Sequence, residues 1–196
     1  MDNIDDTYQT VSSPAQGLYK DRASRFVSFV FPVDSEEEVK DILKSLRKKY
    51  YDATHHCYAY AIGINRALNR QNDDGEPSGT AGKPIFGQIL SHKLSNILIV
   101  VVRYFGGTKL GVSGLINAYR EAASDALAHA GVISKTLNET FIIGFDYSDS
   151  ERVMKAIKKD NARVLEQKYE DKCVIHLEIR QRDAMKLKEA LKEFLK

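Results

Sequence analysis

The chain has 196 residues, of which 43% are hydrophobic, and 29 lysines and arginines against 27 acidic residues leave a formal net charge of +2. This length and hydrophobic content predict a globular protein with one large or two small domains. The small net charge excludes a uniformly basic surface, so any nucleic-acid-binding site must come from a local cluster of cations.

Neither a membrane span nor a secretory signal is recognisable. The longest strongly apolar run, residues 97–102, is far shorter than the roughly eighteen residues of a membrane-spanning helix. The acidic start lacks the basic and then apolar pattern of a signal peptide. We therefore expect a cytoplasmic protein without membrane contact. Cys57 and Cys173 lie far apart without neighbouring cysteines, which predicts two buried reduced thiols rather than a disulfide framework or a zinc site.

The first two thirds of the chain alternate strand-like and helix-like patterns. Ser35 and Glu38 have the spacing of a capping box at the start of a helix. Residues 96–105 hold a long aliphatic run, which predicts a central strand covered on both faces. Thr80 is placed to cap a short helix that reaches His92, and Gly131 to end a longer one. The remaining expected elements are two strands within residues 17–33, the helix over 35–50, a strand over 55–64 and the longer helix over 112–130.

The last third begins a separate pattern of strand, helix, strand, strand and helix. Its first strand covers residues 139–147, and the helix that follows starts at Ser148 with a second capping box to Glu151. Two strands near 163–169 and 173–180 precede a closing helix that buries Leu187, Leu191, Phe194 and Leu195. This order predicts a small ferredoxin-like α+β sandwich. Because residues 132–138 carry no pattern of their own, we expect two domains, residues 1–134 and 135–196.

A glycine-rich turn joins the central strand to the long helix. Such a strand, glycine loop and helix place free backbone N–H groups and the positive end of a helix dipole beside the end of a strand. This arrangement favours an anion-binding site, although an ordinary tight turn with a solvated lysine has the same pattern. The candidate residues here are Arg103, Gly106, Gly107, Thr108, Lys109 and Ser113.

The stretch "NDDGEPSGTAGKP", residues 72–84, contains no apolar side chain larger than alanine or proline. Its glycines permit turns whose N–H groups could face an anion, and an ordinary surface loop is the alternative. The spacing does not fit a Walker nucleotide motif. Asp73, Asp74 and Glu76 could hold a hard cation, but the calcium-loop spacing is missing and a solvated acidic loop is favoured. The anion-site candidates in this stretch are Ser78, Gly79, Thr80 and Lys83.

Other polar residues give weaker indications. His55 and His56 point to opposite faces of a strand and cannot bind one metal ion together, so at most one of them is functional. Tyr58 and Tyr60 could stack bases or belong to a half-buried sheet surface. His55, Tyr58, Asp74 and Glu76 are kept as possible site residues. We assign no catalytic residue, expect no metal and no cofactor, and favour a protein without catalytic activity.

Two motifs in this order resemble the Impact family of translation-linked proteins. They are "DDGEPSGTAGKPI" at residues 73–85 and "VVRYFGGTKLGVSGLINAY" at residues 101–119. The resemblance spans about residues 20–130, and the last third is similar to the small domain attached in bacterial members. It implies an N-terminal domain with the fold of a small-subunit ribosomal protein and of domain IV of elongation factor G. Where the family commonly has a glycine and an arginine, this chain has Ser113 and Asn117, which removes one cation from the anion site.

Three functional hypotheses remain open. The resemblance favours a non-enzymatic regulatory protein that binds RNA or the ribosome through the two glycine loops. The second hypothesis is an enzyme or binder that acts on a nucleotide or another phosphorylated small molecule. The third is a protein-interaction regulator with a protein partner in translation control.

Overall fold

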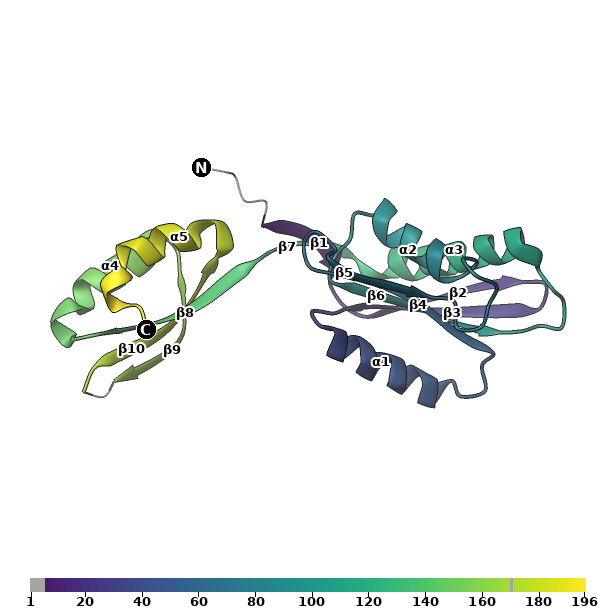
Figure 1. Ribbon diagram of the computed structural model, residues 1–196, viewed down its shortest axis with the longest axis horizontal. Helices are drawn as coiled ribbons and strands as arrows, with labels where there is room; N and C mark the ends of the chain where they lie inside the picture. The colour runs from purple at the N-terminus through teal and green to yellow at the C-terminus, as the bar shows by residue number, and fades with distance from the viewer. Residues whose placement is uncertain (1–5, 170) are drawn as a thin grey trace. The chain divides into compact units, whose positions relative to one another are not determined.

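The computed structural model describes residues 6–169 and 171–196. The protein is of mixed α and β structure with antiparallel sheets and divides into two compact units (Figure 1). One unit is Tyr8–Lys135, and the other is Thr136–Lys196 together with the segment that ends at Thr7. In the described part of the chain, no helix is long and apolar enough to cross a membrane.

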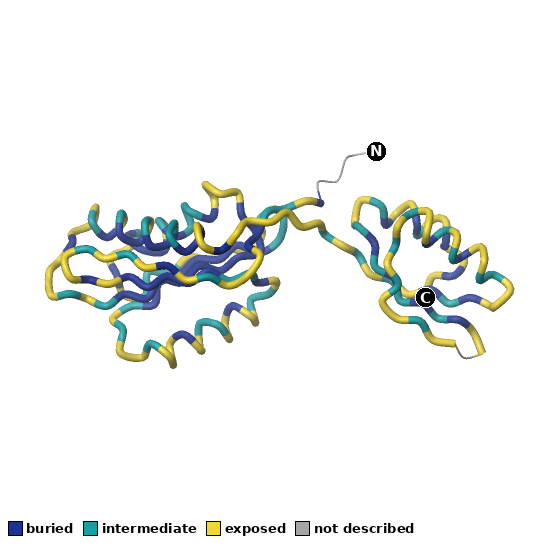
Figure 2. Tube along the Cα trace, turned by 180° about the vertical axis from the view of Figure 1, so that it is seen from behind, coloured by how far each residue is buried: buried dark blue, intermediate teal, exposed yellow. Residues whose placement is uncertain are grey.

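The larger unit is built on a five-stranded antiparallel sheet with the order β2-β3-β6-β4-β5. The predicted central strand is confirmed, because β6 lies in the middle and seven of its eight residues are buried. Helix α1 covers one face of the sheet, and α2 and α3 cover the other (Figure 1). The buried residues follow this layering, with the strands enclosed between exposed helix surfaces (Figure 2). The elements are β2 (Ala15–Asp21), β3 (Ser24–Pro32), α1 (Glu36–Lys49), β4 (His55–Ile62), β5 (Leu68–Asn72), α2 (Gly82–Ser91), β6 (Ile97–Tyr104) and α3 (Gly111–Ala130).

Local sequence signals explain the ends of two of these helices. The Ser35 hydroxyl accepts a hydrogen bond from the Glu38 N–H (3.2 Å), as the capping box predicts, while the Glu38 carboxylate accepts from the N–H of Asp34 (2.9 Å). Helix α3 ends at Gly131, whose φ of 64° lies in the region that favours glycine. Five of the six alanines of α3 are buried, which allows the helix to lie close to the sheet.

Of the two alternatives for Tyr58 and Tyr60, the base-stacking surface is wrong, because both side chains are buried. Tyr58 and Tyr60 are 8% and 4% exposed and pack in the core beneath α1, with their ring centres 6.5 Å apart. Strand β5 was not predicted, and neither was the two-stranded sheet of β1 (Thr7–Val11) and β7 (Val132–Thr136).

The smaller unit has a three-stranded antiparallel sheet with the order β8-β10-β9 and the predicted succession of elements. The predicted capping box between Ser148 and Glu151 is wrong, because a 3-10 turn over Tyr147–Asp149 comes first and no side chain caps the helix. The closing helix ends at Ala190, so Leu195 lies beyond it and is 39% exposed. The elements are β8 (Asn138–Phe145), α4 (Ser150–Lys159), β9 (Arg163–Tyr169), β10 (Cys173–Arg180) and α5 (Gln181–Ala190).

Candidate functional site

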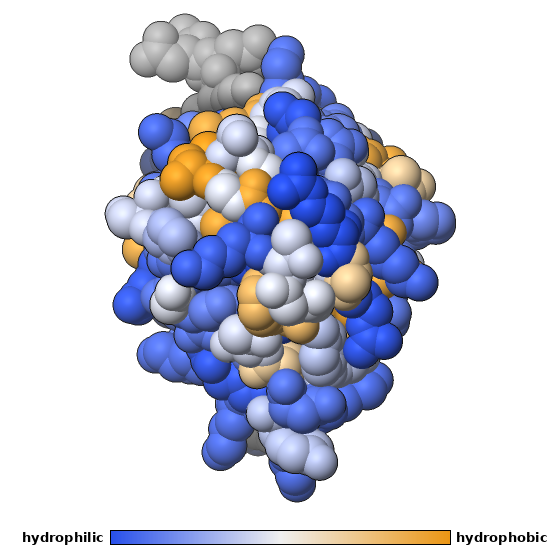
Figure 3. Space-filling model, turned by 90° about the vertical axis from the view of Figure 1, so that its right-hand side faces the viewer, coloured by the Kyte–Doolittle hydropathy of each residue, from blue (hydrophilic) through white to orange (hydrophobic). Residues whose placement is uncertain are grey.

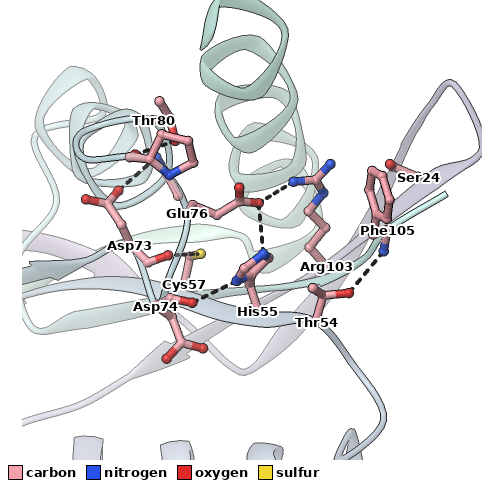
Figure 4. A network of polar contacts seen from close by, with 12 residues as sticks. Ser24, Thr54, His55, Cys57, Asp73, Asp74, Glu76, Thr80, Arg103 and Phe105 are labelled. Atoms are coloured by element: carbon pink, nitrogen blue, oxygen red, sulfur yellow. Dashed lines mark hydrogen bonds and ion pairs between the residues drawn. The ribbon is translucent and has the colours of Figure 1, made fainter. Parts of the chain in front are cut away.

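Two glycine-rich loops lie at one end of the five-stranded sheet. The first glycine loop, residues 73–81, joins β5 to α2, and the second glycine loop, residues 105–110, joins β6 to α3. Strand β6 ends there at Tyr104, and His55 at the start of β4 is paired with Arg103. Strand β5 ends beside Tyr58 and leads into the loop of residues 73–81. The two loops are therefore adjacent, and Figure 4 shows the side chains that connect them.

Asp73 holds the first of these loops in place. Its carboxylate accepts hydrogen bonds from the N–H groups of Gly79 (2.9 Å), Ala81 (3.0 Å) and Gly82 (2.8 Å), at the start of α2. Burial opposes ionisation of this carboxyl, but the three N–H donors keep its pKa below the ordinary value. The helix start that could have received an external anion is thus filled by an acidic side chain of the protein itself.

The predicted cap from Thr80 is wrong. Its side chain is buried, and its hydroxyl donates to the carbonyl of Pro77 (2.6 Å) instead of accepting from the helix. Gly79 is partly exposed and has a φ of 75°, a backbone conformation that residues other than glycine rarely adopt. Ser78 in the loop and Lys83 in the first turn of α2 are exposed.

Asp74 ties the loop to α1 and β4. Its carboxylate accepts from the guanidinium of Arg47 (2.7 Å) and from the N–H of His56 (2.6 Å), and its carbonyl is 2.8 Å from Nδ1 of His55. Burial opposes ionisation, but Arg47 and the His56 N–H hold the pKa of Asp74 below its usual value. Asp74 is therefore an internal partner rather than a ligand for a cation.

Glu76 and Arg103 form a buried ion pair that joins the two loops. Their side chains are 4% and 6% exposed, and Nη1 of Arg103 lies 2.5 Å from Oε1 of Glu76. The same oxygen accepts from the hydroxyl of Tyr119 on α3 (2.8 Å) and lies 3.8 Å from Nε2 of His55. Arg103 also lies over the rings of Phe26 and Phe105. The solvated acidic loop is therefore a wrong interpretation, since its acidic side chains are held inside the protein.

Arg103 accordingly does not serve as a free cation of an anion site, because Glu76 neutralises its charge. Cys57 lies next to this pair, with its sulfur 3.0 Å from the carbonyl oxygen of Asp73 and 3.3 Å from the hydroxyl oxygen of Tyr119. Burial raises the pKa of the Cys57 thiol far above its ordinary value. Within the described residues, no group of histidine, cysteine and acidic side chains could hold a metal ion.

The second glycine loop is pressed against the turn between β2 and β3. A Cβ atom on Gly106 would lie 2.1 Å from the carbonyl carbon of Ala23, so only glycine fits. The Gly106 N–H donates to the hydroxyl of Ser24 (3.1 Å). This contact fixes the start of the loop, while Gly107, Thr108, Lys109 and Ser113 remain exposed.

Helix α3 starts differently from α2. No side chain caps its first turn, and that turn carries no acidic residue. Lys109 lies two residues before the helix and forms no ion pair in the part of the chain that the structure describes. The second glycine loop thus has an exposed lysine and an uncapped helix start, whereas the helix start at the first glycine loop is occupied by the Asp73 carboxylate.

Comparison with known proteins identifies the family. The family model of the Impact N-terminal domain matches residues 22–127, which is more than half of the chain. The protein belongs to the Impact family. The predicted resemblance is confirmed, and the residues of both glycine loops lie inside the matched range.

Relatives and a solved structure extend this similarity beyond the matched domain. IMPACT family member YvyE of Bacillus subtilis is 39% identical over 142 residues, which cover 72% of this chain and 65% of that protein. IMPACT family member YigZ of Escherichia coli is 30% identical over 161 residues, covering 81% and 79%. A crystal structure described only as that of a hypothetical protein is similar with a TM-score of 0.73 and 26% identity, covering 96% of this chain and 92% of that one.

Sequence reasoning missed the roles of Asp73 and Tyr119, and also the basic turn between β2 and β3. No local signal marked Asp73, because a capping residue normally stands directly before its helix, whereas Asp73 reaches the start of α2 from the far end of the loop. The basic turn, in contrast, was visible, since Lys20, Arg22 and Arg25 lie within six residues of one hairpin.

Proposed function

We propose that this Impact family protein is a non-enzymatic, cytoplasmic regulator linked to translation, and that it binds RNA or ribosomal components. In this proposal the contact surface is the end of the five-stranded sheet that carries the two glycine loops. Membership in the Impact family supports the link to translation. We also propose the kinship of the larger unit with domain IV of elongation factor G, and the ferredoxin-like fold of the smaller one, as implied by the resemblance and consistent with the observed order of elements.

The observation that carries the proposal is the contrast between paired and unpaired cations at this end. Arg47 forms an ion pair with Asp74, and Arg103 forms one with Glu76. Lys83 and Lys109, in contrast, are exposed and have no ionic partner among the described residues. Lys109 precedes an uncapped helix start, where free N–H groups favour an anion. Unpaired cations beside open N–H groups suit a phosphate backbone.

The surface at this end supports a polar partner. Figure 3 looks onto the right-hand end of Figure 1, and the side chains there are mostly hydrophilic, with apolar ones in small separate groups. Such a face lacks the broad apolar centre that stable protein interfaces use. A polyanion with a hydrated backbone fits it better than an apolar protein partner.

The test compares RNA binding by the wild type, Lys109→Ala and a matched control, Lys44→Ala. Lys44 is exposed on α1, on the other side of the sheet, and its loss changes the net charge equally. Binding of mixed-sequence RNA is measured by fluorescence anisotropy at several salt concentrations. Lys109→Ala should weaken binding and lower the log-log salt slope by about one unit, because it removes a phosphate contact.

The control should retain the wild-type affinity and slope. If the wild type binds nucleotides with little salt dependence and no RNA, the binder of a phosphorylated small molecule replaces the proposal. If it binds neither, or if Lys109→Ala equals Lys44→Ala, the anion surface is refuted and a protein-interaction regulator takes its place.

A further inference from the structure

A hollow of about 480 Å³ lies beside the turn that joins β2 to β3, lined by residues 20–25 and Tyr104. None of these lining residues is among the anion-site candidates predicted from the sequence. The turn abuts the second glycine loop through Gly106, so the hollow belongs to the same end of the sheet. The hollow therefore borders the second glycine loop, which also carries Lys109, without being part of it.

The lining of the hollow carries an excess of positive charge that one carboxylate offsets in part. Lys20, Arg22 and Arg25 are exposed, and none of them forms an ion pair within residues 6–169 and 171–196. Asp21 is the acidic residue in the lining, so the lining carries a net charge of +2 from three cations and one carboxylate. This differs from Arg103 nearby, whose charge is neutralised by a buried carboxylate.

The cations lie at and beside a tight hairpin turn. Arg22 and Ala23 are the two residues between the paired ends of β2 and β3, and their φ values of 43° and 65° are those of a two-residue hairpin turn. The backbone of Gly106 packs against the Ala23 carbonyl, and its N–H donates to the Ser24 hydroxyl, so the turn lies against the second glycine loop.

An aromatic side chain completes the lining. The guanidinium of Arg25 lies 4.4 Å from the centre of the Tyr104 ring, and the Tyr104 hydroxyl donates to Asp52 (2.9 Å). Arg25 and Tyr104 thus bring together an exposed guanidinium and a partly exposed aromatic ring, two groups on which bases can stack. The hollow thus combines arginines, which suit phosphate oxygens, with a stacking plane.

We propose that this hollow is a binding subsite for the phosphate group of a nucleotide, either within an RNA chain or free in solution. Arg22 and Lys20 contact the phosphate oxygens, and the plane of Arg25 and Tyr104 lies beside the base. The RNA case rests on the proposed function, whereas the free-nucleotide case does not.

The key variant is Arg22→Gly, with Ala23→Gly as its control. Glycine adopts the left-handed conformation freely, so both substitutions preserve the turn, and only the first removes a cation. Arg25→Gln is a second variant that removes charge from the other side of the hollow. The probes are a short mixed-sequence single-stranded RNA and adenosine monophosphate, followed by anisotropy and by amide chemical shifts of the full-length protein.

We expect Arg22→Gly to weaken binding of at least one probe by about tenfold, and Ala23→Gly to bind like the wild type. Adenosine monophosphate or RNA should shift the amides of residues 20–25 and Tyr104, while those of α1 stay in place. If the wild type binds RNA but both charge-removing variants equal Ala23→Gly, this inference is overturned and the proposed function stands.

If the wild type binds adenosine monophosphate in the hollow but no RNA, the proposed function fails and the subsite is one for free nucleotides. Binding of neither probe overturns both. Shifts that spread evenly over the surface, with no loss of affinity in Arg22→Gly, identify non-specific attraction and also overturn the inference.

Discussion

Removing the carboxylate of Asp73 should destabilise the larger unit through the start of α2. Asp73→Ala leaves three N–H groups without their acceptor, and two of them belong to the buried residues Ala81 and Gly82. A single hydrogen bond to a charged acceptor is worth about 1.5–3 kcal/mol, and loss of a helix cap costs about 0.5–2 kcal/mol. Because the three bonds share one carboxylate, we expect a loss of about 2–3 kcal/mol rather than their sum.

The assay is urea unfolding followed by far-ultraviolet circular dichroism, since the chain has no tryptophan. With a slope of about 1–3 kcal/mol per molar urea, the midpoint should fall by about 1–2 M. Amide hydrogen exchange should accelerate first in α2. Asp41→Ala, which removes an exposed carboxylate from α1, is the matched control and should stay within about 0.5 kcal/mol of the wild type.

The same carboxylate makes a pH-dependent contribution with a definite sign. The pKa of Asp73 is lower in the folded than in the unfolded state, so its contribution is complete above the unfolded value of about 3.9. It is lost as the pH falls through the folded pKa, and the difference between wild type and Asp73→Ala should shrink there. If Asp73→Ala unfolds like Asp41→Ala at neutral pH, the capping role deduced from the three distances is refuted.

Three further changes test the interior of the site. Glu76→Ala should cost about 3–5 kcal/mol in urea unfolding, because it leaves the buried charge of Arg103 unpaired; a loss below about 1 kcal/mol would contradict the buried pair. Gly106→Ala should lower the thermal midpoint by several degrees, because its Cβ would lie 2.1 Å from Ala23, and an unchanged midpoint would show that the loops can separate. Cys57 should resist Ellman's reagent in the native state and react only in denaturant, since burial raises the pKa of its thiol; rapid native labelling would count against this packing.

Local patterns predicted the elements whose burial is periodic or continuous. The aliphatic run of β6 and the regularly spaced buried alanines of α3 can be recognised within a short stretch of sequence, and both elements were predicted. Strand β5 was missed because four of its five residues are exposed and show no apolar alternation. It becomes a strand through pairing with β4, and such a contact between separate segments leaves no local signal.

For the two glycine loops, the unusual backbone was predictable from the sequence, but the partners of the charged side chains were not, because they lie on separate segments. Their glycines indicate unusual backbone, and Gly79 and Gly107 do have positive φ values. The partners of their acidic residues lie on other elements: Asp74 is paired with Arg47 on α1, and Glu76 with Arg103 on β6. Composition counts these charges but does not reveal which of them neutralise one another.

That distinction decides which substitutions report on binding. Arg103 is the most prominent cation of the glycine-rich turn in the sequence, yet its replacement would leave the Glu76 carboxylate buried without its partner. Any loss of binding in such a variant would be inseparable from loss of structure. Lys109 and Arg22 have no ionic partner among the described residues, and their side chains are exposed. The paired cation Arg103 thus stabilises this end of the sheet, whereas the exposed cations Lys109 and Arg22 are free to bind a phosphate. Only substitutions of the exposed cations can therefore test what this end of the protein binds.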